Sequence, residues 1–299
     1  MKLQQKLTKG LFLLAAPIFA GSTFNVTPTL AATFASSSST ANLFNFSQTP
    51  LSGSLSVDAD AQGMSLDGFD PGSMVDDGDS VSSNAGSGSI FASADVSAAL
   101  IFDDDPAEAF NSTLSIVGGD SREYIFSAQS DAEVVGNFFL DTASLFSFEF
   151  VVSSLLDTEI DNPLSETVSA SANISFAIFG GTSQSNQTLL DTFSLSAFLQ
   201  SQGPDVGTTL QQSSNNFNLT EFEAIEDFGD SQLEESITFF AGGSYQRNFD
   251  ANSYITVVEV KNNKAAAAVP EPFEPSIVLS LLLTGGAIGM RSKLKSQKV

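Results

Sequence analysis

Two residue types that support much of enzyme chemistry are missing from this chain of 299 residues, which has no cysteine and no histidine. Without cysteine the protein forms no disulfide, so its stability must come from its core even in an oxidising compartment. Cys-His and Ser-His-Asp catalysis and the usual zinc sites are also excluded, because the general base or the metal ligand does not exist. We therefore expect no enzyme and no resident cofactor.

Tryptophan is absent as well, and three tyrosines stand against 27 phenylalanines. Phenylalanine carries no polar group, so these rings predict a large apolar core. A sugar site usually needs exposed aromatic rings with polar tips, and the chain offers only Tyr124, Tyr245 and Tyr254. Tyr245, with the Gln-Arg-Asn run at 246–248, is the cluster to test for sugar binding; the other interpretation is a hairpin turn.

Basic residues are scarce between the two ends of the chain. The middle part has 33 acidic residues and a formal charge of −29, since its only basic residues are Arg122, Arg247, Lys261 and Lys264. Such a domain repels nucleic acid and anionic lipid, so we expect no nucleic-acid partner. Few ion pairs are possible, and we expect salt or divalent cations to stabilise the domain by screening its self-repulsion.

The N-terminus has the pattern of a secretory signal peptide. A lysine-containing stretch at 2–9 precedes an apolar run at 11–20 that is too short for a stable membrane span. Small residues follow, and they offer signal peptidase three positions for cleavage, after Ala31, Ala32 or Ala35. We expect cleavage after Ala32, which makes the signal peptide residues 1–32.

The C-terminus consists of three parts in a fixed order. The Pro270-Glu271-Pro272 triplet is followed by an apolar run at 277–290 and a basic tail at 291–299, with Arg291, Lys293, Lys295 and Lys298. As a helix the run would be about 21 Å long, against a hydrocarbon core of about 30 Å. An apolar helix before a basic cluster is a stop-transfer element. Its short length and its glycines predict a transient anchor that is later removed.

This order of parts, paired with a signal peptide, resembles the PEP-CTERM protein-sorting signal of bacterial surface proteins, those of cyanobacteria included. The resemblance covers residues 269–299 and rests on Pro270, Glu271 and Pro272, the apolar helix, and the basic residues Arg291, Lys293 and Lys295. It implies export by the secretion machinery, a transient stay in the inner membrane, cleavage by an exosortase-like enzyme near the triplet, and release to the cell surface or extracellular matrix. Exopolysaccharide is a further implied partner. A second Glu-Pro pair, Glu274-Pro275, leaves open which one is recognised.

The middle of the chain, residues 51–264, predicts one all-β domain. Apolar and polar residues alternate with a period of two, most regularly at Ala170, Ala172, Ile174, Phe176 and Ile178, and also at Phe146, Phe148 and Phe150. Eight to eleven such strands, without an amphipathic helix, predict an antiparallel β-sandwich of jelly-roll-like kind.

The segments around these strands predict less regular structure. Residues 33–50 are serine-rich and expected to be disordered, and 265–299 are interpreted as an alanine linker followed by the sorting signal. Residues 63–89 predict a long loop, with at most one short strand. Residues 112–117 and 122–129 predict a hairpin, and 188–200 fits a strand pair or a short helix equally.

Clustered aspartates are the remaining candidate site. Asp76, Asp77 and Asp79, with Asp67 and Asp70 nearby, and the run Asp103 to Asp105 would suit calcium, but their spacing is not that of an EF-hand, and solvated turn carboxylates are the other interpretation. Six Asn-X-Ser/Thr sequences, Asn111 among them, are interpreted as chance products of the composition.

The sequence thus favours a secreted, non-catalytic surface or matrix protein; the alternative is a polysaccharide- or calcium-binding adhesion module.

Overall fold

The structure, a computed structural model, describes residues 33–65, 68–76, 79–87, 89–101, 107–119, 124–161, 166–202, 206–228 and 233–269. The expected signal peptide with Ala32 lies outside them, as does the expected sorting signal with Pro270, Glu271, Pro272, Arg291, Lys293 and Lys295. Within the described ranges the chain forms fifteen β-strands and no helix. None of these residues therefore belongs to a helix that is able to span a membrane.

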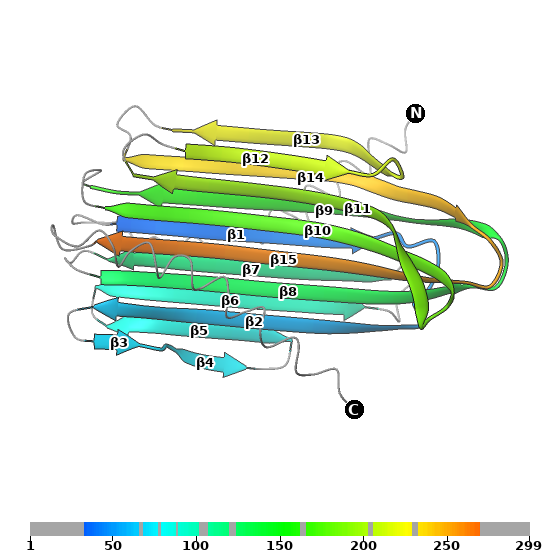
Figure 1. The fold of residues 1–299 in the computed structure, drawn as a ribbon, viewed down its shortest axis with the longest axis horizontal. Coiled ribbons are helices and arrows are strands. Elements are labelled where there is room, and N and C mark those ends of the chain that lie inside the picture. Colours follow the sequence, from blue (N-terminus) through cyan, green and yellow to red (C-terminus); the bar gives the residue numbers. More distant parts are fainter. Residues whose placement is uncertain are drawn as a thin grey trace. The chain divides into compact units, whose positions relative to one another are not determined.

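The strands form two antiparallel sheets, and the strand axes of one sheet lie roughly along those of the other (Figure 1). Sheet A has eight strands, in the order β13 (Phe217–Asp227), β14 (Glu234–Phe249), β9 (Ser144–Glu159), β1 (Thr33–Phe44), β7 (Glu108–Gly119), β6 (Ile90–Ile101), β5 (Ser80–Ser87) and β4 (Ser73–Asp76). Sheet B has seven, in the order β12 (Val206–Ser213), β11 (Asn186–Ser201), β10 (Thr167–Ser183), β15 (Ser253–Val269), β8 (Tyr124–Leu140), β2 (Ser52–Ser65) and β3 (Gly68–Asp70). The expected all-β antiparallel sandwich is confirmed.

The core lies between the two sheets and follows the alternation read from the sequence. Phe146, Phe148 and Phe150 on β9 and the five predicted residues of β10 all point inward and are buried. The ring of Phe150 lies 5.1 Å from those of both Phe176 and Phe193. The buried apolar residues form two clusters. We call them the phenylalanine-rich cluster, which contains Phe150, and the alanine-rich cluster, which contains Phe126 and Ala267.

The serine-rich segment is ordered, so the expectation of disorder over 33–50 is wrong for β1. This strand lies near the centre of sheet A, with β7 on one side and β9 on the other. Its inward row contains Ser37 and Ser39, and Ser39 donates a hydrogen bond of 2.8 Å to the side-chain oxygen of Asn263 on sheet B. Small hydroxyl side chains can be buried when partners across the interior satisfy them.

The expected alanine linker is also partly wrong, because residues 265–269 are the end of β15. Ala265 to Ala268 pair with both β8 and β10, and all four side chains are buried. Ala265 and Ala267 belong to the alanine-rich cluster, where their small size fits an interior that also holds the large rings of Tyr124 and Phe126.

The predicted hairpin of 112–117 with 122–129 does not form. β7 pairs with β1 and β6 in sheet A, whereas β8 pairs with β2 and β15 in sheet B. The two strands face each other across the interior, where the hydroxyl oxygens of Ser115 and Ser130 are 2.9 Å apart. Alternation alone cannot distinguish these arrangements, because both give each strand one buried face.

Two further segments are more regular than expected. Residues 186–201 form the single strand β11 rather than a strand pair or a helix. The segment predicted as a long loop holds the end of β2 together with β3, β4 and β5. Its turn residues separate short strands at the edges of the sheets, and Asp70 accepts hydrogen bonds from the backbone N–H groups of Gly72 and Gly86.

Candidate functional site

A band of polar side chains crosses the interior between the two apolar clusters. On β15 the inward row changes from Val257 to Glu259, Lys261 and Asn263 and then returns to Ala265. The inward rows of β1, β7, β8 and β9 change in the same way. We call this set the polar belt; it comprises Ser37, Ser39, Asn111, Thr113, Ser115, Ser130, Ser154, Glu259, Lys261 and Asn263, all of them buried.

Glu259 and Lys261 are the two charged members of the belt, and each has 0% of its surface exposed. The Lys261 ammonium nitrogen donates to the backbone carbonyl oxygens of Asn111, at 2.6 Å, and Ser39, at 3.2 Å. The Asn111 side-chain amide donates a hydrogen bond to a carboxylate oxygen of Glu259. One residue of sheet A, Asn111, therefore touches both ionisable groups of sheet B.

Burial shifts both ionisable groups toward their neutral forms. It raises the pKa of Glu259 to about 7, although Lys261 and the hydrogen bond from Asn111 act in the opposite direction. It lowers the pKa of Lys261 to about 7, opposed by the charge of Glu259. Near neutral pH a neutral acid beside a neutral amine is therefore accessible, which is unusual for a Glu and a Lys.

The hydrogen bonding of the belt is incomplete. Four buried polar atoms of the belt have no hydrogen-bond partner within the described part of the chain, namely Oδ1 of Asn111, Oγ1 of Thr113, Oε1 of Glu259 and Nδ2 of Asn263. Leaving a buried donor or acceptor unpaired costs about 1–3 kcal/mol. Such atoms concentrated around one Glu-Lys pair point to a chemical role.

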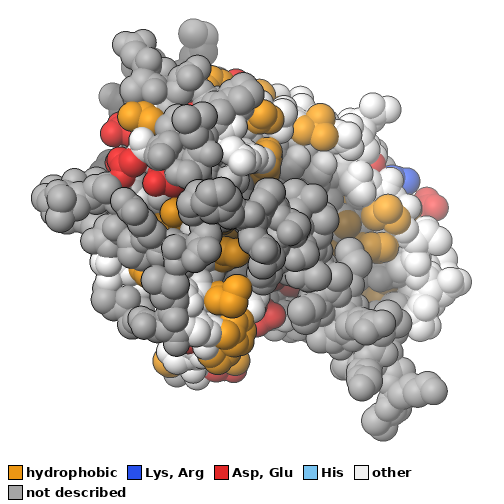
Figure 2. Space-filling model, turned by 60° about the vertical axis from the view of Figure 1, so that its left-hand side comes forward, with side chains coloured by type: hydrophobic (Ala, Val, Ile, Leu, Met, Phe, Trp, Pro, Cys, Tyr) orange, Lys and Arg blue, Asp and Glu red, His pale blue; other side chains and the backbone are white. Residues whose placement is uncertain are grey.

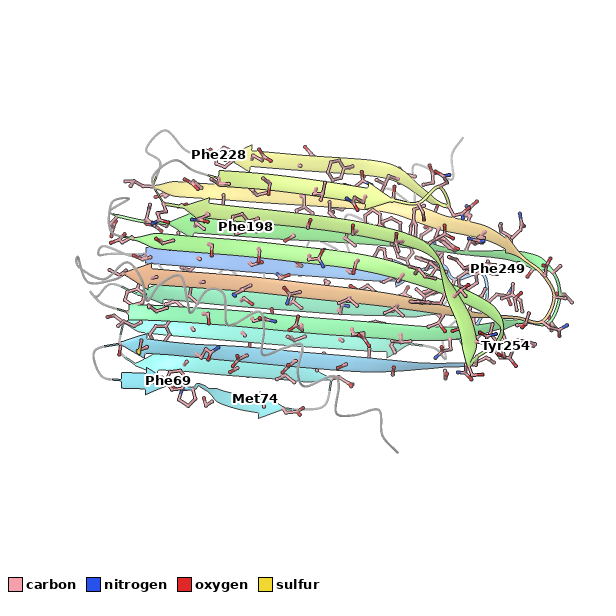
Figure 3. The ribbon with its side chains drawn as sticks, in the orientation of Figure 1. Phe69, Met74, Phe198, Phe228, Phe249 and Tyr254 are labelled. Carbon is pink, nitrogen blue, oxygen red and sulfur yellow. The ribbon has the colours of Figure 1, made fainter. Side chains whose placement is uncertain are left out.

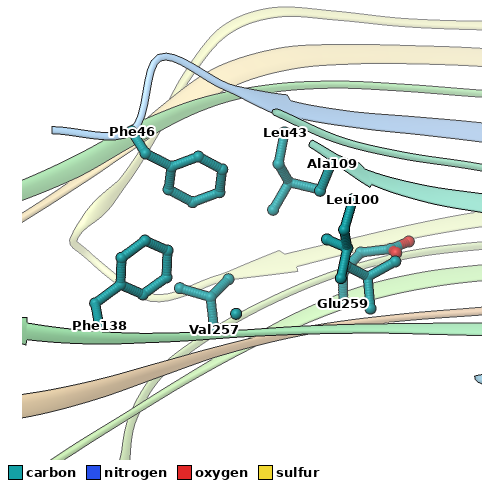
Figure 4. A pocket seen from close by; sticks show the side chains of 9 residues that line it. Leu43, Phe46, Leu100, Ala109, Phe138, Val257 and Glu259 are labelled. Atoms are coloured by element: carbon teal, nitrogen blue, oxygen red, sulfur yellow. The ribbon is translucent and has the colours of Figure 1, made fainter. Parts of the chain in front are cut away.

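A small cavity adjoins this pair. It is lined by Glu259 and by apolar residues of both sheets, and its size is close to that of one water molecule. Figure 4 shows the Glu259 carboxylate at one end of this space, with Leu100 beside it and Phe46 and Phe138 further away. A molecule the size of water or ammonia fits beside the carboxylate.

A second polar cluster between the sheets is centred on Asp191 of β11. The Arg247 guanidinium donates to its carboxylate at 2.7 Å, the Tyr245 hydroxyl at 2.9 Å, and Ser214 and Asn216 also donate. Burial would raise the pKa of Asp191, but these hydrogen bonds outweigh it and the pKa is lowered. The cluster is a satisfied structural link from β11 to β14.

The expectation of a sugar site at Tyr245 is therefore wrong. The Tyr245 side chain has 0% of its surface exposed and its ring lies in the core, 4.9 Å from that of Phe217. The alternative of a hairpin turn is wrong too, because β14 continues through 246–248 in register with β9. Alternation could have indicated this, since Tyr245 falls on the same face as the inward-pointing Phe239.

Replacing Asp191 by asparagine should lower the free energy of unfolding by about 1.5–3 kcal/mol at pH 7, since charge-assisted hydrogen bonds would be lost. The folded pKa of Asp191 lies below its unfolded value of about 3.9, so its stabilisation is present above that pH and is lost as the pH falls through the folded pKa. Urea denaturation from pH 2 to pH 7 should therefore show the difference from wild type shrinking in acid. Exposed Asp141→Asn is the control; an equal loss there, or a pH-independent loss at Asp191, would contradict this role.

The aspartate clusters lie mostly outside the described residues, among them Asp67, Asp77 and the run 103–105. Of the described members, Asp70 accepts two backbone hydrogen bonds, which lower its pKa. No three acidic side chains in the described ranges come together as a metal site. Asp and Glu side chains are visible at several places on the face in Figure 2, and Lys or Arg side chains are scarce there.

An aromatic pair with polar neighbours lies on the outer face of sheet B. The rings of Phe139 and Tyr254 are 4.8 Å apart, and Figure 3 shows Tyr254 near the start of β15. The Thr256 hydroxyl lies 2.8 Å from the side-chain oxygens of Asn137 and Gln187. The Gln187 amide nitrogen has no hydrogen-bond partner among the residues that the structure describes.

Comparisons with known proteins give no assignment. No family model matches this sequence, and no curated protein matches it. Among solved structures, the translocator domain of the autotransporter NalP from Neisseria meningitidis aligns at 9% identity with a TM-score of 0.13, over 88% of this chain and 98% of that one. A TM-score this low carries no conclusion about fold or function.

Proposed function

We propose that this chain is a secreted, non-catalytic protein of the cell surface or extracellular matrix, delivered by a PEP-CTERM-like sorting signal. The observation that carries the proposal is the order of parts at the C-terminus: Pro270-Glu271-Pro272, the apolar run 277–290 and the basic tail 291–299. The apolar run is too short for a robust span, which suits an anchor that is removed. Its partners are then the secretion machinery, the inner membrane and an exosortase-like enzyme.

The described strands are compatible with both expected cleavages. β1 begins at Thr33, directly after the expected cleavage at Ala32, and β15 ends at Val269, directly before Pro270. Cleavage after Ala35 would remove a buried residue of β1, which favours the earlier positions. Removing residues 1–32 and the residues after 269 would thus take away no residue of a strand that the structure describes. The jelly-roll-like description of the sandwich belongs to this proposal too, supported by connections that repeatedly cross between the sheets.

Replacing Pro270, Glu271 and Pro272 together by alanine should trap the protein in the membrane fraction of a host that carries the sorting enzyme. Without the recognition sequence the apolar run stays attached and keeps the chain in the bilayer. Cell fractionation followed by immunoblotting measures the released fraction. Alanine at Glu274 and Pro275 is the matched control for the second Glu-Pro pair. Unchanged release of the triplet variant would count against the triplet.

The second candidate function is polysaccharide binding, which the pair of Phe139 and Tyr254 favours. Aromatic rings beside amide and hydroxyl groups provide stacking and hydrogen bonds, which sugars use. If this surface binds glycan, Tyr254→Ala should weaken binding at least tenfold in a glycan array followed by calorimetry. The buried-ring variant Tyr124→Phe serves as control. Absence of binding by the wild-type protein to any glycan, with or without calcium, would remove this candidate.

A further inference from the structure

We propose that Lys261 and Asn111 form an intramolecular amide bond, an isopeptide, that joins sheet B to sheet A, with Glu259 transferring the protons and ammonia as the product. The proposal concerns a modification of the folded domain and is independent of how the protein is delivered. It accounts for a Glu, a Lys and an Asn that are buried together between two otherwise apolar clusters.

The three groups are already in contact. The Lys261 amine nitrogen is 2.6 Å from the backbone oxygen of Asn111, and the Asn111 side-chain amide is hydrogen-bonded to Glu259. These contacts hold a nucleophile and an acid against the same residue, so little translational freedom remains to be lost when the bond forms. The nucleophile only has to move from the backbone carbonyl of Asn111 to the side-chain carbonyl carbon, Cγ.

The protonation states suit the reaction. An amine attacks only when neutral, and a buried lysine reaches that state at a lower pH than an exposed one. Burial lowers the pKa of Lys261 and raises that of Glu259. The folded interior therefore favours a neutral amine beside a protonated carboxyl group. Among the described residues no further ionisable side chain belongs to the polar belt.

The step balances without an oxidant or a reductant. The Lys261 nitrogen forms a bond to Cγ of Asn111, while protonated Glu259 donates its proton to the developing oxyanion at Oδ1, an atom with no hydrogen-bond partner among the described groups. The carboxylate of Glu259 then takes a proton from the attacking nitrogen. Glu259, now protonated again, gives this proton to Nδ2 as the bond from Cγ to Nδ2 breaks, and it takes back the proton on Oδ1 as the carbonyl group re-forms. One amine and one primary amide thus become one secondary amide and one ammonia, and Glu259 ends in its starting protonation state.

The surroundings favour the product. The cavity beside Glu259 is large enough for a molecule the size of ammonia. Apolar residues from both sheets line it and keep bulk water from competing for the carbonyl carbon. The bond would also give a chain without cysteine a covalent link between its sheets. Because Asn111 is buried, its Asn-X-Ser/Thr sequence serves this site rather than an accessible glycan.

Mass spectrometry of the folded full chain tests the bond. We expect a mass about 17 Da below that of the sequence, from the loss of one ammonia. Cleavage after glutamate, performed on the denatured protein, should give the peptide 109–123 and the C-terminal peptide that begins at Val260, joined as one species through Asn111 and Lys261, since Glu271 and Glu274 precede prolines and resist cleavage. Recovery of the two peptides separately would overturn the proposal, even with a mass loss, since cyclisation of an asparagine elsewhere also releases ammonia.

Three variants assign the roles. Glu259→Gln keeps the shape of the side chain but cannot transfer the protons, so we expect a folded protein with the linked fraction reduced at least tenfold. Lys261→Arg should abolish the link, and Lys264→Arg, on the outer face of the same strand, should retain it. Full linkage in Glu259→Gln would overturn the role of Glu259. If that variant fails to fold, the wild-type digest still decides whether the bond exists.

Discussion

Replacing Lys261 by methionine is expected to lower the free energy of unfolding by about 3–5 kcal/mol at pH 8, measured by urea denaturation. In protein that has not formed the proposed amide bond, the substitution leaves Glu259 as a buried carboxyl group without its cation, and breaking one half of a buried pair has a cost of this size. In linked protein the variant instead lacks the cross-link, and the expected loss is then that of the link. This single change should destabilise the sandwich as much as the loss of a large core side chain.

The loss should depend on pH in a defined direction. Burial raises the folded pKa of Glu259 above its unfolded value, and removing Lys261 takes away an interaction that opposes this shift. The folded state then binds more protons than the unfolded state, so stability is highest in acid and falls by up to about 1.4 kcal/mol per pH unit as the pH rises toward the folded pKa. For protein without the amide bond, a loss that is equal at pH 5 and pH 8 would contradict the burial of an unpaired carboxyl group.

The double variant Lys261→Met, Glu259→Leu separates the two contributions. It leaves no buried charge, so it should recover part of the stability that the single variant loses. The part that is not recovered measures the cross-link together with the altered packing. In the chain-entropy model a covalent link that closes about 150 residues is worth roughly 5 kcal/mol. Equal stability of the single and double variants would indicate that burying the Glu259 carboxyl group without Lys261 does not lower the free energy of unfolding.

Deleting residues 33–44 is expected to abolish cooperative folding, although this segment looks like a disordered linker by composition. The deletion removes β1, and β7 and β9 then lose their shared partner near the centre of sheet A. Their backbone N–H and C=O groups would be left unpaired inside a sheet, where each unsatisfied buried group is costly. The expected result is a loss of the cooperative thermal transition that far-ultraviolet circular dichroism follows.

A chain that begins at Thr33 is the control for this deletion, because it lacks only residues outside the described domain. It should melt cooperatively, and a chain that begins at Asn45 should not. If both chains melt at the same temperature, β1 is dispensable and its central place in sheet A is wrong.

The sequence predicts the fold class because alternation with a period of two is a direct consequence of strand geometry. Phe146, Phe148 and Phe150 show it plainly, and they are buried as expected. Which strands pair is not contained in that signal. β7 and β8 are adjacent in sequence with turn residues between them, yet they lie in different sheets. The serine-rich β1 was missed because its burial depends on partners such as Asn263, more than two hundred residues away.

The polar belt could be anticipated only in part. On β15 both rows mix apolar with polar residues, so composition does not indicate which one faces inward; the row that contains Glu259 and Lys261 does, and the row that contains Val258 and Val260 faces outward. The available signal was the rarity of basic residues, which makes a Lys two positions after a Glu within a strand unusual. The contact of both with Asn111 depends on the packing of β7 against β15, which no local pattern encodes.

The measurement that tests the proposed function most directly is the intact mass of the protein isolated from cells with and without the sorting enzyme. With the enzyme present, the released protein should lack residues 1–32 at its N-terminus and residues 273–299 at its C-terminus. Without the enzyme, the membrane fraction should retain the C-terminal segment. Retention of residues 273–299 in both samples would contradict delivery by a sorting signal that is removed.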